Sequence, residues 1–491
     1  MKSEVENQGP SLIKNSSFQK IMNTKNYVMI LCVASLFFSC KKETDQFVKP
    51  DDEPDKYLVT SPTILDYQVI GNEIELNWEH STEASPMSYQ VIINDQEYND
   101  PSKYFTVKLG YDSTYSGQLK AIYPDGEHAI VSFDFTTPKS QILFIVDYGI
   151  LRAIDLYTKN VIWEHLDLLN SPSHGSPIVY ENKIIIGKNK LTALDIFTGE
   201  VVWENNMESI INFKTPFLWA TMGNTMYIPG YYTYFDEVYS LDMDDGTLNW
   251  NRHMGGGRLN IGEFMYLGFD AYDWAGRFLW RAKFDPAKCY PGGANQITSP
   301  PLLHKNNLYF GDVKAVIYSV NALTGVKNWS ISLDCVGHDV SRGGPAIYEN
   351  NIIFPIKKKL YSINSTTSEI NWINYSSSDL IYSVPFVYES IILITSSSES
   401  YVKGEILAID AINGGMLWRV NIPSRIKSSP ILFQDKVFVG SQSEFYELDA
   451  ATGEITWFYS AGSPSHISPV IVVGDSEVII YSGDTRTIEF P

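Results

Sequence analysis

Apolar and polar positions repeat along most of the chain with a period of about 42 residues. In each repeat an apolar residue, a variable residue and Asp or Asn precede a turn such as Thr-Gly, and a short run ending in Trp follows. From Trp163 to Trp457 there are 294 residues in seven intervals, with a short interval of 30 before Trp280 and a long one of 49 after it. The tryptophans are Trp163, Trp203, Trp250, Trp280, Trp329, Trp372, Trp418 and Trp457.

Each repeat predicts four short strands. The Asp or Asn ends one strand, and its side chain can hydrogen-bond the backbone of the turn. Glycine suits this tight turn because it adopts positive φ without strain. The next strand ends in Trp, which supplies apolar area between neighbouring sheets. A dipeptide ending in Pro precedes the first strand of most repeats, as in Ser429-Pro430 and Ser468-Pro469. Repeated four-stranded units predict a β-propeller.

The repeats at 141–491 resemble the pyrroloquinoline-quinone-type (PQQ-like) repeat, which seven of the eight units match. The resemblance implies a PQQ-like β-propeller over 139–491. Residues 142–163 lack an opening Ser-Pro, and the strands around Val470, Val478 and Ile488 lack a closing Trp. We expect these halves to share one blade and close the ring. That arrangement gives eight blades, or seven if the weak Trp280 unit is an insertion.

Residues 58–138 alternate short β-like runs with turns, and the whole chain is therefore expected to be all-β. About seven short strands in 80 residues are typical of a sandwich. A core Trp78 on an early strand and the segment Tyr115-x-Gly-x-Leu-x-Ala121 resemble a fibronectin type III domain. The segment has no cysteine, which disfavours the disulfide-bearing immunoglobulin type. The resemblance implies a spacer.

The N-terminal region predicts export and a lipid anchor. The apolar stretch 27–38 is too short to span a bilayer and is typical of a signal peptide. Its end, Ser39-Cys40, resembles a bacterial lipoprotein signal, which implies cleavage before Cys40 and acylation of that residue with fatty acids such as palmitate. We expect residues 1–39 to be the signal peptide, with Met22 as the true start, and 40–57 to be a tether. This tether resembles surface-export signals of Bacteroidetes lipoproteins, but Lys41 and Lys42 depart from them. The cell surface and the periplasmic face of the outer membrane both stay open.

The net charge limits the classes of partner, and the cysteine content limits the possible disulfides. The chain has 57 acidic and 37 basic residues, a net charge of −20, which argues against nucleic acid or an anionic membrane surface as the main partner. Contact with a membrane is expected only through the lipid on Cys40. Cys289 and Cys335 remain in the propeller, either as a disulfide or as two thiols, because an exported protein permits both.

The residues argue against an enzyme. Quinone dehydrogenases carry adjacent cysteines, a calcium site and a catalytic Asp, whereas the propeller cysteines here are not adjacent. The alignable Asp and Asn recur in nearly every repeat, which favours a role in folding over a single active site. No histidine pair or Cys/His cluster has metal-ligand spacing. We therefore expect no PQQ, other cofactor or metal.

Two sets of residues are candidates for binding. The first set contains the residue three positions before each opening Pro. These residues would converge at one mouth of the central channel and bind an anionic ligand or an acidic peptide there. The alternative is that the channel is polar and filled with water. It consists of His174, Phe213, Ile297, Arg342, Tyr382, Lys427 and His466. The second is aromatic and would bind sugars or proteins if exposed, or pack under a loop if buried. It consists of Trp219, Tyr231, Tyr232, Tyr234, Tyr272 and Trp274.

These observations predict a non-catalytic lipoprotein of the cell envelope whose propeller binds or scaffolds an envelope protein or a glycan. One alternative is an outer-membrane protein assembly factor, because the chain resembles the BamB-type propeller lipoprotein. In that family the anchor normally leads directly into the propeller, so the fibronectin-like spacer weakens the match. The second alternative is a carbohydrate-active protein at the cell surface, which would need an acidic pair in a deep pocket.

Overall fold

The structure is a computed structural model of the whole chain. It describes residues 59–81, 86–100, 102–147, 149–166, 177–187, 190–206, 220–231, 236–254, 259–283, 301–312, 316–333, 343–375, 380–381, 383–398, 403–426, 428–460, 468–474 and 479–482. Every regular element in these residues is a β-strand, which confirms the all-β prediction. None of them forms a helix long and apolar enough to cross a membrane.

The chain divides into two compact units. The first ends at Thr136 and contains residues up to Val69, Glu73–Lys108 and Thr114–Thr136. The second contains Ile70–Asn72, Leu109–Ser113 and Thr137–Pro491. Each unit has its own sheets and its own apolar interior, so they are described separately.

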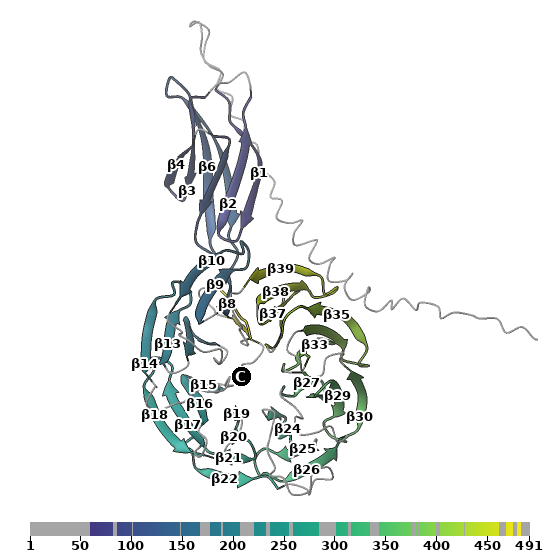
Figure 1. Cartoon of the computed structure of the whole chain (residues 1–491). Helices are drawn as coiled ribbons and strands as arrows, with labels where there is room; N and C mark the ends of the chain where they lie inside the picture. The colour runs from purple at the N-terminus through teal and green to yellow at the C-terminus, as the bar shows by residue number, and fades with distance from the viewer. Residues whose placement is uncertain are drawn as a thin grey trace, which may run out of the picture. The chain divides into compact units, whose positions relative to one another are not determined.

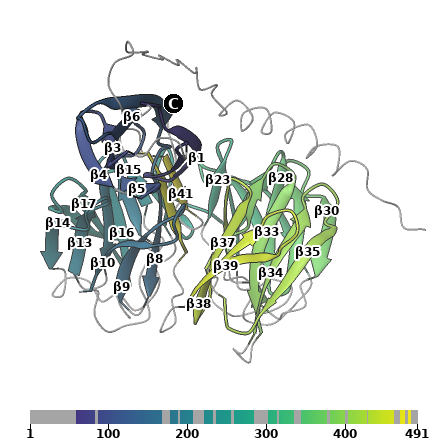
Figure 2. The same cartoon turned by 90° about the horizontal axis from the view of Figure 1, so that it is seen from above.

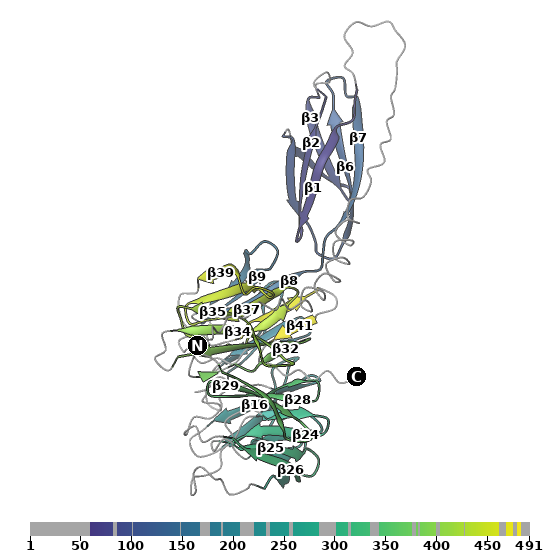
Figure 3. The ribbon, with the colours of Figure 1, turned by 90° about the vertical axis from the view of Figure 1, so that its right-hand side faces the viewer.

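The first unit has seven strands in two antiparallel sheets (Figure 3). One sheet has the order β1-β2-β5 and the other β4-β3-β6-β7. The strands are β1 (Thr63–Ile70), β2 (Glu73–Glu79), β3 (Ser88–Ile93), β4 (Gln96–Asp100), β5 (Tyr104–Lys108), β6 (Thr114–Ile122) and β7 (His128–Thr136). Side chains alternate along β2, so that Ile74, Leu76 and Trp78 are buried. The predicted core position of Trp78 is confirmed, and its ring packs edge-on against Tyr89.

The second unit is a β-propeller, in which sheets follow one another around a ring (Figure 1). We number the sheets from 1 to 8 in chain order. Sheet 1 contains β8 (Gln141–Asp147), β9 (Ile150–Asp155), β10 (Val161–His165), β40 (Val470–Val473) and β41 (Ile479–Ser482), and sheet 2 contains β11 (Ile178–Tyr180), β12 (Lys183–Gly187), β13 (Lys190–Asp195) and β14 (Val201–Asn206). Sheet 3 contains β15 (Ala220–Met222), β16 (Thr225–Tyr231), β17 (Asp236–Asp242) and β18 (Leu248–His253). Sheet 4 contains β19 (Leu259–Ile261), β20 (Met265–Leu267), β21 (Asp270–Tyr272) and β22 (Phe278–Arg281).

The remaining four sheets repeat this order with antiparallel neighbours, except that in sheet 7 both β31 and β32 pair with β33. Sheet 5 contains β23 (Leu302–His304), β24 (Asn307–Gly311), β25 (Val316–Asn321) and β26 (Lys327–Ser332), and sheet 6 contains β27 (Ala346–Tyr348), β28 (Asn351–Ile356), β29 (Lys359–Asn364) and β30 (Ile370–Tyr375). Sheet 7 contains β31 (Leu380–Ile381), β32 (Phe386–Tyr388), β33 (Ile391–Ser397), β34 (Gly404–Asp410) and β35 (Met416–Ile422). Sheet 8 contains β36 (Ile431–Phe433), β37 (Lys436–Gly440), β38 (Glu444–Asp449) and β39 (Ile455–Ser460).

Sheet 1 joins the two ends of the propeller sequence. Strand β40 pairs antiparallel with β8, with Val470 opposite Phe144 and Val473 opposite Gln141. Blue and yellow strands therefore lie in one sheet in Figure 1. The prediction that 142–163 and the strand at Val470 share a sheet is confirmed. Val478 and Ile488 lie outside the described residues. The Trp280 segment forms a sheet of its own, sheet 4.

The apolar core lies between sheets rather than within any one of them. Each described cluster of the propeller joins two consecutive sheets: Trp203 of sheet 2 packs with Met226 and Leu241 of sheet 3, for example. Sheets 7 and 8 share another such cluster, and Figure 2 shows their strands side by side in green and yellow. A further cluster joins Phe438 of sheet 8 to Leu143 of sheet 1. Since every sheet buries both faces this way, no sheet has a core without its neighbours.

Candidate functional site

The sequence-predicted binding residues lie mostly outside the described part of the chain. This holds for the anchor Cys40, for the pair Cys289 and Cys335, and for the whole channel-mouth set: His174, Phe213, Ile297, Arg342, Tyr382, Lys427 and His466. It also holds for Trp219, Tyr232 and Tyr234. Tyr231 ends β16, but its side chain is not described. The convergence of the mouth residues therefore stays a prediction.

Tyr272 and Trp274 do not form an exposed platform. The Tyr272 side chain is buried in the apolar cluster between sheets 3 and 4. Trp274 is partly buried against the same cluster, and its ring centroid lies 5.6 Å from that of Tyr227. Tyr272 is therefore buried, as in the alternative that these rings pack inside, whereas Trp274 is half-buried. Packing between sheets is their role, because a large ring buries more apolar area there than at the surface.

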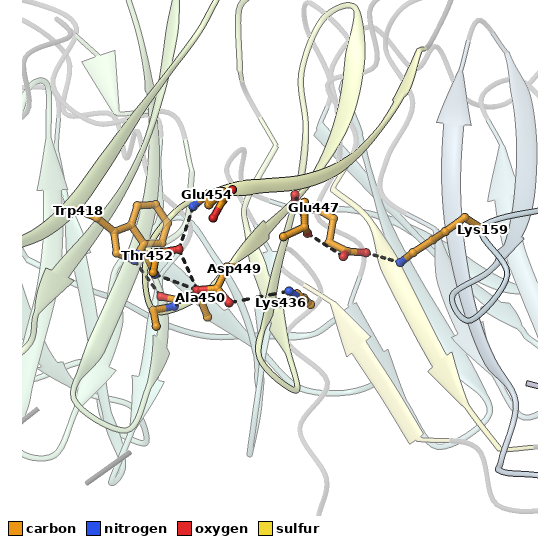
Figure 4. Close-up of polar contacts among 10 residues, drawn as sticks. Lys159, Trp418, Lys436, Glu447, Asp449, Ala450, Thr452 and Glu454 are labelled. Carbon is orange, nitrogen blue, oxygen red and sulfur yellow. Dashed lines mark hydrogen bonds and ion pairs between the residues drawn. The ribbon is translucent and has the colours of Figure 1, made fainter. Parts of the chain in front are cut away.

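The recurring Asp and Asn residues are used in the turns. In sheet 8, Asp449 Oδ1 accepts hydrogen bonds from the backbone N–H of Ala451 at 3.1 Å and of Thr452 at 2.9 Å (Figure 4). Asp195 and Asn364 accept bonds of 2.9 Å from the two equivalent N–H groups of their own turns. The predicted turn role is confirmed, and Asn performs it as well as Asp. A carboxylate charge is not needed for it.

These bonds also set the ionisation of Asp449. Burial acts to raise the pKa of its carboxyl, but the hydrogen bonds from Thr452 and Ala451 and the nearby Lys436 favour the charged form, and the pKa is below its usual value. Lys436 Nζ is 3.8 Å from Asp449 Oδ2. The carboxylate is therefore held ionised by its own turn, which suits a structural group rather than a proton donor.

Five of the repeat tryptophans lie against the turn glycine of the next sheet. A Cβ added to Gly453 would lie 2.7 Å from the ring of Trp418, and one added to Gly199 would lie 2.6 Å from the ring of Trp163. Both glycines also have positive φ. Glycine is therefore required twice, by the turn and by the neighbouring ring. The sequence indicated only the first reason, because the second depends on contact between sheets.

The indole N–H completes this junction. Trp418 Nε1 donates to the carbonyl oxygen of Ala450 at 2.8 Å, and Trp203 Nε1 donates to that of Met243 at 3.0 Å. Each acceptor directly follows the turn Asp, so turn, glycine and carbonyl together form one docking site for the ring. The prediction that Trp packs between sheets is confirmed. The prediction that its strand ends there is wrong, since β35 continues to Ile422.

Two recurring features were missed by sequence reasoning. Every outermost strand contains a β-bulge one residue before its Trp: in sheet 2, Val201 pairs with Leu194 and Trp203 with Ala193, which leaves Val202 without a partner in the ladder.

The serine of Ser-Pro also links neighbouring sheets. The N–H of Val384 donates to Ser429 Oγ at 3.0 Å, and that of Ser429 donates to Ser468 Oγ at 2.8 Å. The recurrence of Ser before Pro was the available signal.

Two segments of the chain, residues 125–256 and 402–490, match a protein family described as outer membrane protein assembly factor BamB. The matched segments lie mostly in the second unit. They include sheets 1, 2, 3 and 8 and strands β34 and β35 of sheet 7, and therefore both partners of each Trp-to-turn junction described above. No curated protein sequence matches the chain.

Several solved structures are similar to this chain at low sequence identity. The crystal structure of the computationally designed Ika8 protein is 11% identical, with a TM-score of 0.50, and the match covers 64% of this chain and 97% of Ika8. BamB from Moraxella catarrhalis is 14% identical with a TM-score of 0.36, over 69% of this chain and 93% of that one. Apo AztD from Citrobacter koseri is 14% identical with a TM-score of 0.47, over 69% of this chain and all of that one.

Quinohemoprotein alcohol dehydrogenases are also similar in structure, for example that of Comamonas testosteroni, with 14% identity and a TM-score of 0.39 over 71% of this chain and 74% of that one. Within the described residues, no group of three or more His, Cys, Asp or Glu side chains is placed to hold a metal ion. The repeats of the propeller use their recurring polar residues in turns and sheet junctions.

Proposed function

We propose that this protein is a non-catalytic lipoprotein of the cell envelope whose propeller serves as a binding or scaffolding platform for a protein or a glycan. The observation that carries the proposal is that the recurring Asp and Asn side chains bond their own turns, as Asp449 does to Ala451 and Thr452. A platform needs a rigid frame that presents loops. The junctions between sheets supply that frame.

The proposal includes eight blades and a fibronectin type III-like spacer. Eight sheets in the described part of the second unit support the first point. The sandwich order β1-β2-β5 and β4-β3-β6-β7 supports the second. In this arrangement residues 1–39 are the signal, Cys40 carries the lipid, and 40–57 form a tether that lifts the folded units off the outer membrane.

A second candidate function is assembly of outer-membrane proteins. The match of two segments to the family described as outer membrane protein assembly factor BamB favours it. On this reading the partner is an outer-membrane protein, and the propeller faces the periplasm. The sandwich before the propeller is the feature that fits this alternative least.

Protease treatment of intact cells separates the two functions. Loss of the propeller places it on the cell surface and contradicts the assembly role, whereas protection places it in the periplasm. A Cys40→Ala variant should leave the membrane fraction in the same preparations. Retention of that variant in the membrane would overturn the lipid anchor.

Binding is tested with the channel-mouth residues. Cross-linking in cells, followed by purification of the full chain, should recover a partner that is weakened by the double variant Arg342→Ala, Lys427→Ala. Lys327→Ala is the matched control, because Lys327 lies exposed on the outermost strand β26. Equal recovery with all three proteins would contradict the mouth as binding site. Dye reduction after addition of PQQ and calcium with alcohols or sugars would contradict the non-catalytic role.

A further inference from the structure

The central hairpin of sheet 4 is the shortest in the described part of the propeller. Its strands β20 and β21 have three residues each, whereas the corresponding strands of the other seven sheets have five to seven (Figure 1). A backbone N–H in such a hairpin exchanges with solvent only when its ladder opens, and a shorter ladder has fewer hydrogen bonds to break. Sheet 4 therefore has less backbone bonding to keep it closed than its neighbours have.

The row of side chains that crosses this hairpin also differs at one position. In sheets 3 and 5, which precede and follow sheet 4, a Tyr lies opposite a Ser, and the Ser lies opposite the Trp of the outermost strand. These rows are Tyr227, Ser240 and Trp250 in sheet 3, and Tyr309, Ser319 and Trp329 in sheet 5. In sheet 4 the row is Tyr266, Ala271 and Trp280. Sheet 4 therefore has the tyrosine of its neighbours without the serine.

The missing serine affects the hydroxyl of Tyr266. In sheet 3 the side chains of Tyr227 and Ser240 are hydrogen-bonded. Tyr266 is 1% exposed, and its hydroxyl oxygen is buried with no hydrogen bond of normal geometry. Burial raises the pKa of Tyr266 to about 12, and the nearby backbone N–H of Phe264 acts in the opposite direction. That N–H is a donor, so the hydroxyl proton still has no acceptor.

The indole N–H of Trp280 is a second buried donor without an acceptor. The ring itself lies against sheet 5, because a Cβ added to Gly325 would be 2.5 Å from it. At the junction of sheets 7 and 8 the carbonyl oxygen of Ala450 accepts the N–H of Trp418. Trp280 Nε1 is buried and has no hydrogen-bond partner. The contact of sheet 4 with sheet 5 therefore keeps the ring and lacks the hydrogen bond.

Both donors favour an open state of sheet 4 over the closed one. A buried donor without an acceptor forms hydrogen bonds with water once it is exposed, so opening recovers its desolvation cost. At the junctions of sheets 2 and 3 and of sheets 7 and 8, opening breaks an indole hydrogen bond instead. The ion pair of Arg281 with Asp270 joins β22 to β21, but both residues belong to sheet 4 and do not attach it to sheet 5.

We propose that sheet 4 opens locally in the folded protein, ahead of the other seven sheets, and is the place where the closed ring yields. Segments that adapt to a partner come from the least stable parts of a fold. The proposal therefore makes sheet 4 the adaptable part of the propeller. It does not depend on the identity of the ligand or on the leaflet.

Hydrogen exchange of the full purified chain at low urea concentrations, measured by mass spectrometry, tests the proposal. We expect the amides of β20 and β21 to exchange about tenfold faster, or more, than those of the hairpins β12–β13 and β28–β29. This rate should change little with urea, because a local opening exposes little surface. Exchange at one common rate in all three hairpins, with the same steep dependence on urea, would mean global unfolding only and would overturn the proposal.

The same substitution in two sheets gives the matched comparison. Tyr266→Phe removes a hydroxyl that has no acceptor, so we expect exchange in sheet 4 to slow severalfold. Tyr227→Phe removes a hydroxyl that bonds Ser240, so exchange in sheet 3 should become faster. Ala271→Ser supplies the serine of the neighbouring sheets and should also slow exchange in sheet 4. If neither Tyr266→Phe nor Ala271→Ser slows it, the proposal is overturned.

Discussion

The junction between sheets 7 and 8 and the junction between sheets 8 and 1 do the same task with different chemistry. At the first, the Trp418 ring lies on Gly453 and its N–H donates to Ala450. At the second, Lys159 lies over Trp457 and pairs with Glu447, and Arg152 lies 5.7 Å from the ring centroid of Tyr459. The ordinary junction depends on shape and apolar contact. The junction of sheets 8 and 1 instead places an ion pair against the Trp ring.

The largest expected effect is loss of the ring at the ordinary junction. Trp418→Ala should lower the free energy of unfolding by about 3–5 kcal/mol, because a buried aromatic side chain and its hydrogen bond are both lost. Trp457→Ala should cost less, since Trp457 is less buried. Urea denaturation of both variants checks the order. Equal losses would mean that the two junctions contribute alike.

Crowding at the glycine is expected to come next. Gly453→Ala should destabilise by on the order of 2 kcal/mol, because the new Cβ combines an unfavourable positive φ with a clash against Trp418. Gly223→Ala is the matched control in the same unit: φ is +57°, and nothing lies within 4 Å of the added atom. The difference between the two denaturation midpoints measures the crowding alone. If the midpoints coincide, the ring does not require the glycine.

Removal of a single charge at the junction of sheets 8 and 1 should lower the stability by less than the two changes above. Lys159→Met keeps the length of the side chain but leaves Glu447 buried without its cation, and we expect a loss of roughly 1–2 kcal/mol after allowance for the partial exposure of Lys159. Glu447→Gln should cost less, since Lys159 can turn toward water. Thermal unfolding at low and high salt checks this, with the wild type more sensitive to salt than either variant. If the melting temperatures of the wild type and of Lys159→Met change equally with salt, the junction is not stabilised electrostatically.

The smallest expected effect is the acid response of the turn beside the ordinary junction. The pKa of Asp449 is lower in the folded chain, so its contribution to stability is full above the ordinary pKa of about 3.9 and is lost as the pH falls through the folded value. The variant Asp449→Asn imitates the turn of Asn364. Its stability should therefore lie further below that of the wild type at pH 7 than at pH 3. Denaturation midpoints at both values check the sign. A constant difference would show that the carboxylate charge is irrelevant.

Sequence reasoning reached the strands and the turns because their signals are local. Asp449, Thr452 and Gly453 lie within five residues, and the bonds that join them form inside that segment. Trp78 and the alternation of β2 could likewise be interpreted within one strand. The burial of Tyr272 could not, because it depends on the cluster between sheets 3 and 4. The binding set at the channel mouth, including Arg342 and Lys427, stays a prediction.

The sequence by itself determined the repeat, the propeller type and the turn role of Asp and Asn, because backbone hydrogen bonding and side-chain alternation act over a few residues. Only the tertiary structure decided which residues meet across a junction. Lys159 and Glu447 are 288 residues apart, and each is an exception only by comparison with the same position in the other sheets. Their meaning appears only when the chain returns to its start, since contact between distant segments is set by the closure of the ring and not by any local preference.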